Sequence, residues 1–212
     1  MRDFPVFTTE NGVGSLVLKE IPYRGVAYIT IRDSLTPAEF LSECVDFCRA
    51  VGAEHIYASG HEILETYPLY TSVFQMTGSV SLIPETDVCL FPVSEVTLHQ
   101  WCEIYNRRME KVDNASYLSE REARELLKSG DTYFIHRNGE LLGIGKASGN
   151  RIDCVASVKS GCGKEIVCAL VHGLLSDPLV LDVASTNMRA IRLYESLGFI
   201  KTMEISRWYK II

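Results

Sequence analysis

The strongest chemical signal in the sequence is a glycine-bearing turn between a predicted strand and a predicted helix. The segment VASVKSGCGKEI, at 155–166, runs from an apolar stretch through two glycines into a helical pattern. A turn of this kind points consecutive backbone N–H groups at one spot with the helix dipole behind them, so it can hold a pyrophosphate. The glycines let the backbone come close to the anion. Because Gly-x-Gly is also common in plain turns, this segment alone leaves an ordinary turn open.

A second segment, LDVASTNMRAIRLYESLGF at 181–199, brings a polar cap, a small residue and a phenol together. Asn187, Ala190 and Tyr194 are spaced by three and four residues, so they share one face of a helix. An ordinary amphipathic helix, capped by Asn187 and closed by Gly198, explains much of this pattern without any ligand.

The stretch 187–199 closely resembles the N-x-x-A-x-x-L-Y-E-x-x-G-F signature of the GNAT acetyltransferase superfamily, and the strand before it matches that superfamily's Leu-acidic-Val pattern. The resemblance covers about residues 86–212, including the order of the elements. It implies an α/β fold with a mixed, mostly antiparallel central sheet flanked by helices. It also implies acetyl-CoA as cosubstrate, bound where the fourth and fifth strands splay apart to admit the pantetheine arm.

The resemblance assigns roles to individual residues. Tyr194 would lie beside the cofactor sulfur as general acid, and Asn187 would contact the cofactor arm. Asp182 corresponds to the acidic position that some peptide-type members of the superfamily use as the base. The fourth strand would offer backbone hydrogen bonds to pantetheine from Asp153, Val155 and Ser157. The loop would cradle the pyrophosphate with Ser160, Gly161, Cys162, Gly163, Lys164 and Glu165.

Acetyl transfer needs these residue types independently of the resemblance. An amine of pKa about 10 is mostly protonated at neutral pH, so a carboxylate must take a proton, directly or through water, before the amine attacks the thioester. Asp182 can fill this role, and Asp153 is the competing base. The alternatives are a solvated strand-edge role for Asp153 and a helix-supporting or solvated role for Asp182. The leaving thiolate, whose thiol has a pKa of about 8.5, can be protonated by the Tyr194 phenol.

The loop departs from the superfamily's usual R/Q-x-x-G-x-G/A pattern at two places. Ser160 stands at the first position and Glu165 at the last. A glutamate in the first turn of a helix is ordinary for stability, but beside a pyrophosphate it adds repulsion unless it turns outward. Lys159 and Lys164 could offset this repulsion. Cys162, between the two glycines, could carry a reactive thiol at the helix start.

The elements around these residues fall into two halves. The first is predicted to contain a hairpin at 13–31, a helix that Thr36 caps with a capping box and that ends at Gly52, and strands at 55–59 and 69–76. The second is predicted to read βααβββαβαβ, with helices capped by Ser94 and Ser119 and a type I′ turn at Asn138-Gly139. The expected domains are 1–84, a degenerate GNAT-like αβ unit, and 85–212, the acetyltransferase domain.

Both halves share the rhythm of hairpin, helix, strand and final strand, at 13–76 and at 133–209. We interpret this as a degenerate internal duplication. The first half has neither the glycine loop nor the Asn-x-x-Ala-x-x-Leu-Tyr spacing, so it is not expected to bind CoA in the same way. Its expected role is to extend the sheet and to shape the acceptor side.

Composition limits the class of protein. The chain has 212 residues, 47% of them apolar, and a net charge of -6 from 21 Lys+Arg and 27 Asp+Glu. The excess of acidic residues argues against nucleic acid as a partner, and the absence of a long apolar run argues against a membrane. Seven cysteines without a CxxC pair, and five scattered histidines, signal neither a disulfide framework nor a metal site. We therefore expect a cytoplasmic protein without a metal, which could form a homodimer.

The sequence thus predicts an acetyl-CoA-dependent N-acetyltransferase of the GNAT type that transfers the acetyl group directly to a primary amine of a small molecule or peptide. The first alternative is a catalytically silent acyl-CoA-binding module, which Glu165 favours. A further alternative is a purely structural interaction protein, which would not bind CoA at all. The identity of the amine is not encoded in a readable motif.

Overall fold

The computed structural model describes residues 5–113 and 115–212, and its chain packs as two compact units. Unit 1 runs to Val73 and also takes up Glu204–Ile212, and unit 2 is Phe74–Met203. Two long strands, β5 (Leu69–Gly78) and β11 (Ile200–Lys210), each contribute residues to both units. None of the described helices has an apolar run long enough to cross a bilayer.

The packing divides the chain at other places than the expected boundary between 84 and 85. Met76 and Ile83 lie in the core of unit 2, so the second half of β5 and the connection after it belong there. Tyr209 lies in the core of unit 1, where it pairs with Ala58. The chain passes between the units after Val73 and after Met203, in the middle of β5 and of β11. Because both points lie within strands, no linker-like change of composition marks them.

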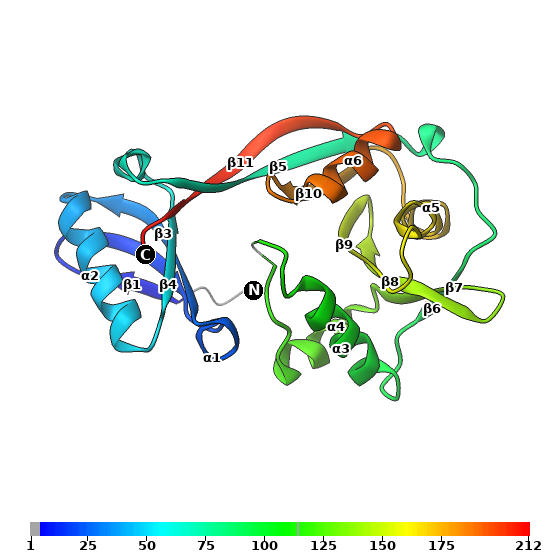
Figure 1. Cartoon of the computed structure of the whole chain (residues 1–212), viewed down its shortest axis with the longest axis horizontal. Helices are drawn as coiled ribbons and strands as arrows, with labels where there is room; N and C mark the ends of the chain where they lie inside the picture. Colours follow the sequence, from blue (N-terminus) through cyan, green and yellow to red (C-terminus); the bar gives the residue numbers. More distant parts are fainter. Residues whose placement is uncertain (1–4, 114) are drawn as a thin grey trace. The chain divides into compact units, whose positions relative to one another are not determined.

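Unit 1 is an αβ unit with one helix against its strands (Figure 1). Its further elements are β1 (Val6–Thr8), β2 (Gly12–Val17), α1 (Ile21–Arg24), β3 (Val26–Ser34), α2 (Pro37–Ala50), β4 (His55–Ser59) and η1 (Glu62–Thr66). The strand order is β1-β2-β3-β4-β11-β5. The predicted hairpin is confirmed as β2 and β3, although the helical turn α1 takes the end of its first predicted strand. Phe40, Leu41, Cys44 and Cys48 of α2 are buried against the strands.

The capping box predicted at Thr36 is wrong. The Thr36 hydroxyl makes no cap to its own helix and donates instead to Asn11 Oδ1 at 2.5 Å. The Asn11 Nδ2 group donates to Glu43 Oε1 of α2 at 2.7 Å. A tertiary contact between the β1–β2 turn and α2 therefore replaces the local cap.

Unit 2 carries the elements that position the predicted site. They are η2 (Val80–Leu82), β6 (Cys89–Pro92), α3 (Leu98–Met109), α4 (Glu120–Ser129), β7 (Thr132–Arg137), β8 (Glu140–Ser148), β9 (Arg151–Ser157), α5 (Gly163–Leu174), β10 (Leu179–Ala184) and α6 (Met188–Ser196). The strand order is β11-β5-β10-β9-β8-β7-β6. This is a mixed sheet, with β6 to β9 antiparallel and β10 parallel to β9.

Local signals in unit 2 are largely confirmed. Ser119 and Glu122 form the predicted capping box of α4, and Gly130 closes that helix in the left-handed conformation. Asn138 and Gly139 both have positive φ, 50° and 82°, as a type I′ turn requires. The helix expected after Ser94 begins later, at Leu98, with Thr97 at its N-cap.

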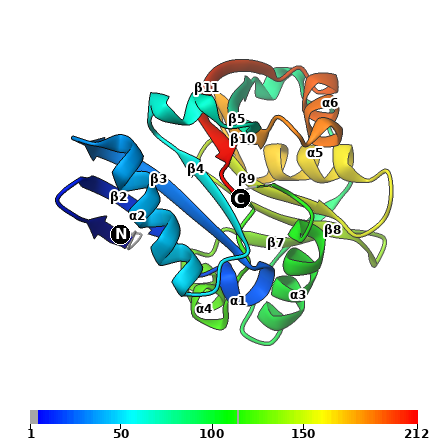
Figure 2. The same ribbon diagram turned by 60° about the vertical axis from the view of Figure 1, so that its left-hand side comes forward.

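Helices cover both faces of the unit 2 sheet. Helix α5 packs on β8 and β9 from one side in a core that includes Ile166, Val167 and Leu170. Helix α3 packs on the same two strands from the other side, where Trp101 and Ile104 are buried with Ile144. Figures 1 and 2 show α5 and α3 on opposite sides of these strands. The two cores fix both faces of β9, the strand on which the predicted cofactor contacts lie.

A close approach at Gly143 holds β8 against β9 and α5. A Cβ at this position would lie 2.4 Å from the Ala156 carbonyl oxygen and 2.5 Å from Ile166 Cδ1.

We expect Gly143→Ala to lower the free energy of unfolding in urea by about 1–3 kcal/mol, because neither the β9 backbone nor the packed isoleucine can easily move away. Ser148→Ala, at the exposed end of the same strand, is the control and should change it by less than about 0.5 kcal/mol. Equal unfolding midpoints for the two variants would contradict this close approach.

Candidate active site

The parallel strands β9 and β10 pair only at their beginnings. Val180 pairs with Arg151 and Leu181 with Ile152, and no further pair joins the described residues of the two strands. Both strands continue after this point, to Ser157 and to Ala184. The backbone edges that face each other beyond Ile152 and Leu181 are therefore not used by the sheet. This is the splay between the fourth and fifth strands that the resemblance predicts.

The corresponding parallel pair of unit 1 is closed. Strand β4 pairs with β3 along its whole length, from Val26↔His55 to Thr30↔Ser59. The two units have the same order of hairpin, helix and parallel strand, yet only unit 2 leaves the ladder open. The opening coincides with the presence of the glycine loop. The duplication itself stays a prediction.

A β-bulge lies where the opening begins. Lys146 pairs with Cys154 and Ala147 with Ile152, so Asp153 has no partner on β8. The extra residue changes which face the later side chains reach. Ile152 belongs to the core under α5, whereas Cys154 belongs to the core under α3. Asp153 is thus the bulged residue at the closed end of the opening.

The two candidate bases lie in one chain of ion pairs. Asp153 Oδ1 accepts from Arg151 Nε at 3.2 Å, and the same guanidinium contacts Asp182 through Nη2. Asp153 Oδ2 also accepts from Lys146 Nζ at 2.6 Å, and Asp131 contacts that ammonium at 2.9 Å. Burial lowers the pKa of Lys146, but its hydrogen bonds to the Asp153 and Asp131 carboxylates outweigh burial and leave that pKa raised. Each carboxylate that could serve as base is therefore already paired with a cation.

Tyr194 lies in the core of unit 2, beside β9. Its ring centroid is 5.7 Å from that of Phe199. Burial raises the pKa of the phenol, and the nearby Cys154 thiol raises it further. The hydroxyl has no hydrogen-bond partner within the described residues, so its proton is not already donated within the protein. The phenol therefore stays protonated around neutral pH, as a proton donor must.

Cys154 is the thiol next to Tyr194, so we consider it as a candidate nucleophile. Burial, followed by the neighbouring Asp153 carboxylate, raises its pKa to about 12. At neutral pH the group is therefore a neutral thiol rather than a thiolate.

The predicted loop follows β9 and leads into α5. Gly161 has φ of 89°, a conformation that favours glycine, and no atom lies within 4 Å of the position its Cβ would take. The first backbone bond of α5 runs from the Ile166 N–H to the Cys162 carbonyl. Within the described residues, the N–H groups of 160–165 have no backbone acceptor. Consecutive N–H groups at a helix start form the donor set that an anion such as a pyrophosphate requires.

Cys162 occupies the N-cap position of α5 and is buried. Its side chain makes no cap hydrogen bond. The Cys162 backbone takes part in the helix start through its carbonyl, which accepts from the Ile166 N–H, and a reactive role for its thiol stays a prediction.

Asn187 is the N-cap of α6, as the sequence predicts for an amphipathic helix. Its Oδ1 atom accepts a hydrogen bond from the Ala190 N–H at 3.2 Å. The cap uses the carbonyl end of the side chain, so the amide N–H groups still point outward from this contact. Asn187 can therefore serve both as cap and as a donor toward the cofactor arm.

Two ion pairs at the loop were not predicted. Arg137 Nη1 lies 3.1 Å from Glu165 Oε1, and Lys159 Nζ lies 2.8 Å from Glu140 Oε1. Glu140 raises the pKa of Lys159 through its hydrogen bond. Lys159 is thus committed to a protein carboxylate, whereas Lys164 is exposed and has no ion pair within the described residues. Nothing in the local sequence links 137 to 165, because the contact depends on how β7 and α5 are placed.

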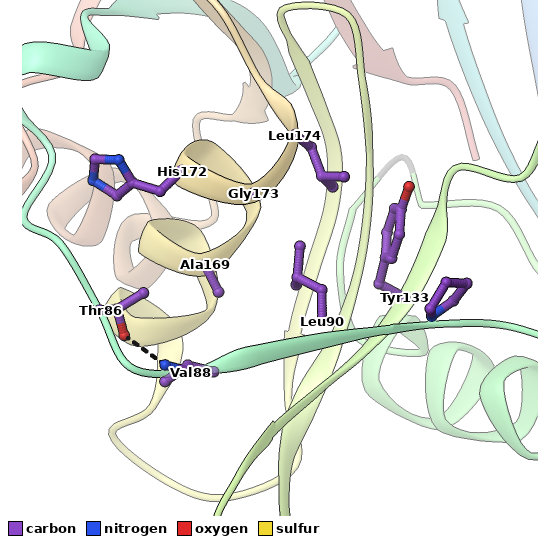
Figure 3. Close-up of a pocket in the computed structure, with 9 residues that line it drawn as sticks. Thr86, Val88, Leu90, Tyr133, Ala169, His172, Gly173 and Leu174 are labelled. Atoms are coloured by element: carbon purple, nitrogen blue, oxygen red, sulfur yellow. Dashed lines mark hydrogen bonds between the residues drawn. The ribbon is translucent and has the colours of Figure 1, made fainter.

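A pocket of about 470 Å³ lies elsewhere in unit 2, between α5 and the edge strand β6 (Figure 3). Its lining residues are Thr86, Val88, Leu90, Pro92, Tyr133, Ala169, His172, Gly173 and Leu174. His172 Nε2 lies 2.9 Å from the Ile83 carbonyl oxygen. The pocket includes none of the predicted site residues and lies at the C-terminal half of α5, away from the loop at its N-terminus.

Neither a family model nor a curated protein matches this chain. Solved structures do. A GCN5-related N-acetyltransferase from Kribbella flavida has 12% identity and a TM-score of 0.55, over 99% of this chain and 89% of that one. A tandem GNAT protein from the clavulanic acid biosynthesis pathway has 11% identity and a TM-score of 0.50, over 94% and 78% of the two chains.

The chain has a GNAT fold. A conserved protein of unknown function from Staphylococcus epidermidis shares the architecture with a TM-score of 0.59, at 13% identity over 99% of this chain and 94% of that one. At such identities the likeness establishes the fold alone. The GNAT fold agrees with the signature at 187–199 and with the mixed, mostly antiparallel sheet that the signature implied.

Proposed function

We propose that the protein is an acetyl-CoA-dependent N-acetyltransferase that transfers an acetyl group directly to a primary amine. The observation that carries this proposal is the opening between β9 and β10 after Ile152 and Leu181. An unpaired parallel ladder is costly unless other groups satisfy its backbone, and an extended amide-containing chain can do so. Pantetheine is such a chain.

The residues around the opening fit acetyl-CoA. Its diphosphate would lie at the N–H groups of 160–165, and its amides would meet the free edge of β9 at Val155 and Ser157. Asn187 would donate to the arm from the start of α6. Acetyl-CoA supplies an activated thioester, and the protein's task is to orient it and to manage protons.

The proton donor in this proposal is Tyr194. The phenol is neutral at working pH, lies beside β9 and has no acceptor of its own within the described residues. It can therefore donate to the sulfur as negative charge develops there. Because its pKa is raised, the phenol keeps its proton until charge has developed on the sulfur.

The base is Asp182 or Asp153, and Arg151 connects the two. Either carboxylate can accept the proton of an incoming ammonium only if its ion pair with the guanidinium loosens. A cationic amine favours this exchange, because it replaces one positive partner by another. We therefore propose an amine-bearing small molecule or peptide as acceptor.

The second candidate is a catalytically silent acyl-CoA-binding module. The specific observation in its favour is that both candidate bases are occupied by Arg151, and Asp153 also by Lys146. Such pairs are also what a purely structural network would show. The two candidates differ in turnover and not in binding.

Calorimetric titration with acetyl-CoA and with CoA tests the cofactor site. We expect a Kd in the micromolar range, about -8 kcal/mol, because the loop and the open strand edge offer many donors. Release of free CoA in the presence of polyamines, aminoglycosides or basic peptides then tests turnover. Binding without turnover on any amine selects the silent module, and absence of binding up to millimolar ligand rejects both.

Tyr194→Phe should lower kcat by about 100-fold with little change in acetyl-CoA binding, since only the proton donor is removed. The matched control is Tyr133→Phe, which removes a phenol at the other edge of the same unit. Steady-state kinetics over a pH series measure both variants. An unchanged kcat in Tyr194→Phe would remove this residue as the acid.

Asp182→Asn should change the acidic limb of the pH–rate profile, because an amide cannot accept the proton of the amine. Asp153→Asn is measured in parallel, and Asp131→Asn is the control that perturbs Lys146 without touching Arg151. If Asp182→Asn and wild type have the same profile, the base is Asp153 or water.

A further inference from the structure

The β7–β8 hairpin forms an ion pair with each end of the phosphate loop. In one pair the hairpin supplies the cation, and in the other it supplies the anion. Arg137 and Glu140 stand on either side of the Asn138-Gly139 turn, and they pair with Glu165 and Lys159 at the two ends of the loop. The loop backbone is tied to the same hairpin, because the Val158 N–H donates to the Leu142 carbonyl at 2.8 Å. One hairpin thus controls an acidic and a basic side chain of the loop.

Glu165 is the residue that should oppose an anionic ligand. It lies in the first turn of α5, next to N–H groups that have no backbone acceptor within the described residues. A carboxylate turned toward that donor set would occupy it and would repel a diphosphate. Whether the loop can bind CoA therefore depends on where this side chain points.

The Glu165 carboxylate lies against the end of β7, with one of its two oxygens buried. Its Oε1 atom accepts from Arg137 Nη1 at 3.1 Å. Its Oε2 atom is buried and has no hydrogen-bond partner within the described residues. An unpaired buried carboxylate oxygen is unfavourable, so the orientation depends on the guanidinium that holds the other oxygen.

Arg137 is itself fixed in place. Its Nε and Nη2 atoms lie 3.1 and 3.0 Å from Asp87 Oδ1, while Nη1 is directed at Glu165. A planar guanidinium that is held on one edge presents its remaining donors in a set direction. Asp87 therefore aims Arg137 at Glu165.

We propose that Arg137 is a positioning residue for the cofactor, which holds the Glu165 carboxylate out of the phosphate cradle at 160–164. This inference rests on the proposed function, since it assigns a role in CoA binding. Glu140 has the opposite effect, because it withdraws the positive charge of Lys159 from the same loop. Arg137 therefore favours CoA binding because it holds a negative charge away from the loop, and Glu140 opposes CoA binding because it holds a positive charge away from the loop.

The test is a double-mutant cycle on CoA binding by calorimetry, with wild type, Arg137→Gln, Glu165→Gln and the double variant. We expect Arg137→Gln to weaken binding by about tenfold, because the released carboxylate faces the diphosphate. Glu165→Gln should bind as tightly as wild type or more tightly. The double variant should return to within about twofold of Glu165→Gln, since no carboxylate is left to release.

Three controls separate this role from a merely structural one. Glu140→Gln should strengthen CoA binding, because it frees Lys159, and loss of packing cannot give that sign. Acetyl-pantetheine, which lacks the diphosphate, should bind wild type and Arg137→Gln equally. Arg137→Lys keeps the charge but not the planar fork, so it should retain only part of the affinity, and it keeps the proposal testable if Arg137→Gln folds poorly.

The outcomes are distinct. If wild type does not bind CoA, the proposed function fails, and this inference fails with it. If wild type binds CoA but Arg137→Gln binds equally well, or the double variant is as weak as Arg137→Gln, only the positioning role is overturned. An equal loss for acetyl-pantetheine also overturns it, because the effect would then not act through the diphosphate.

Discussion

The structure of unit 2 depends on a parallel ladder that stops after two pairs. Strands β9 and β10 are joined at Arg151–Val180 and Ile152–Leu181 and then separate. Two strands of one sheet do not stay apart without support, because their free N–H and C=O groups favour pairing. The support is visible on both sides of β9. The core under α5 anchors Ile152, the core under α3 anchors Cys154, and the bulge at Asp153 lets one strand reach both.

The loop and α6 lie next to this open ladder in the chain. Strand β9 ends at Ser157, and the turn at Gly161 leads directly into α5. Tyr194 then lies beside the open part of β9, buried but with an unshared hydroxyl within the described residues. Unit 2 thus supplies backbone donors from the loop, an open strand edge from β9 and a neutral phenol from α6. Net charge gives no guide to this, because a protein of net charge -6 still presents a donor-rich loop with an exposed Lys164.

Sequence reasoning reached the parts of this site that are local in the chain. The glycine loop, the N-cap at Asn187, the type I′ turn and the capping box at Ser119 are each encoded within a few residues, and the structure has all four. Contacts between distant elements were missed. Thr36 has the right residue types for a capping box, yet its hydroxyl bonds Asn11. Arg137 and Arg151 carry no local sequence signal, although they form ion pairs with Glu165, Asp153 and Asp182.

The two units share one succession of elements, but only unit 2 carries the candidate site within the described residues. Unit 1 has the same succession of hairpin, helix and parallel strand, and its β3–β4 ladder is complete from Val26 to Thr30. Its helix begins at Pro37 and follows a connection without glycine, in which the Leu35 and Thr36 N–H groups donate to the Asn11 carbonyl. A complete ladder satisfies its own backbone and needs no ligand. In unit 2 the backbone groups of β9 and β10 beyond Ile152 and Leu181 are not paired with each other. An extended chain that contains amides could satisfy such groups. The element order is common to both units, and the units differ in the register of the parallel pair, which is complete in β3–β4 and stops after two pairs in β9–β10.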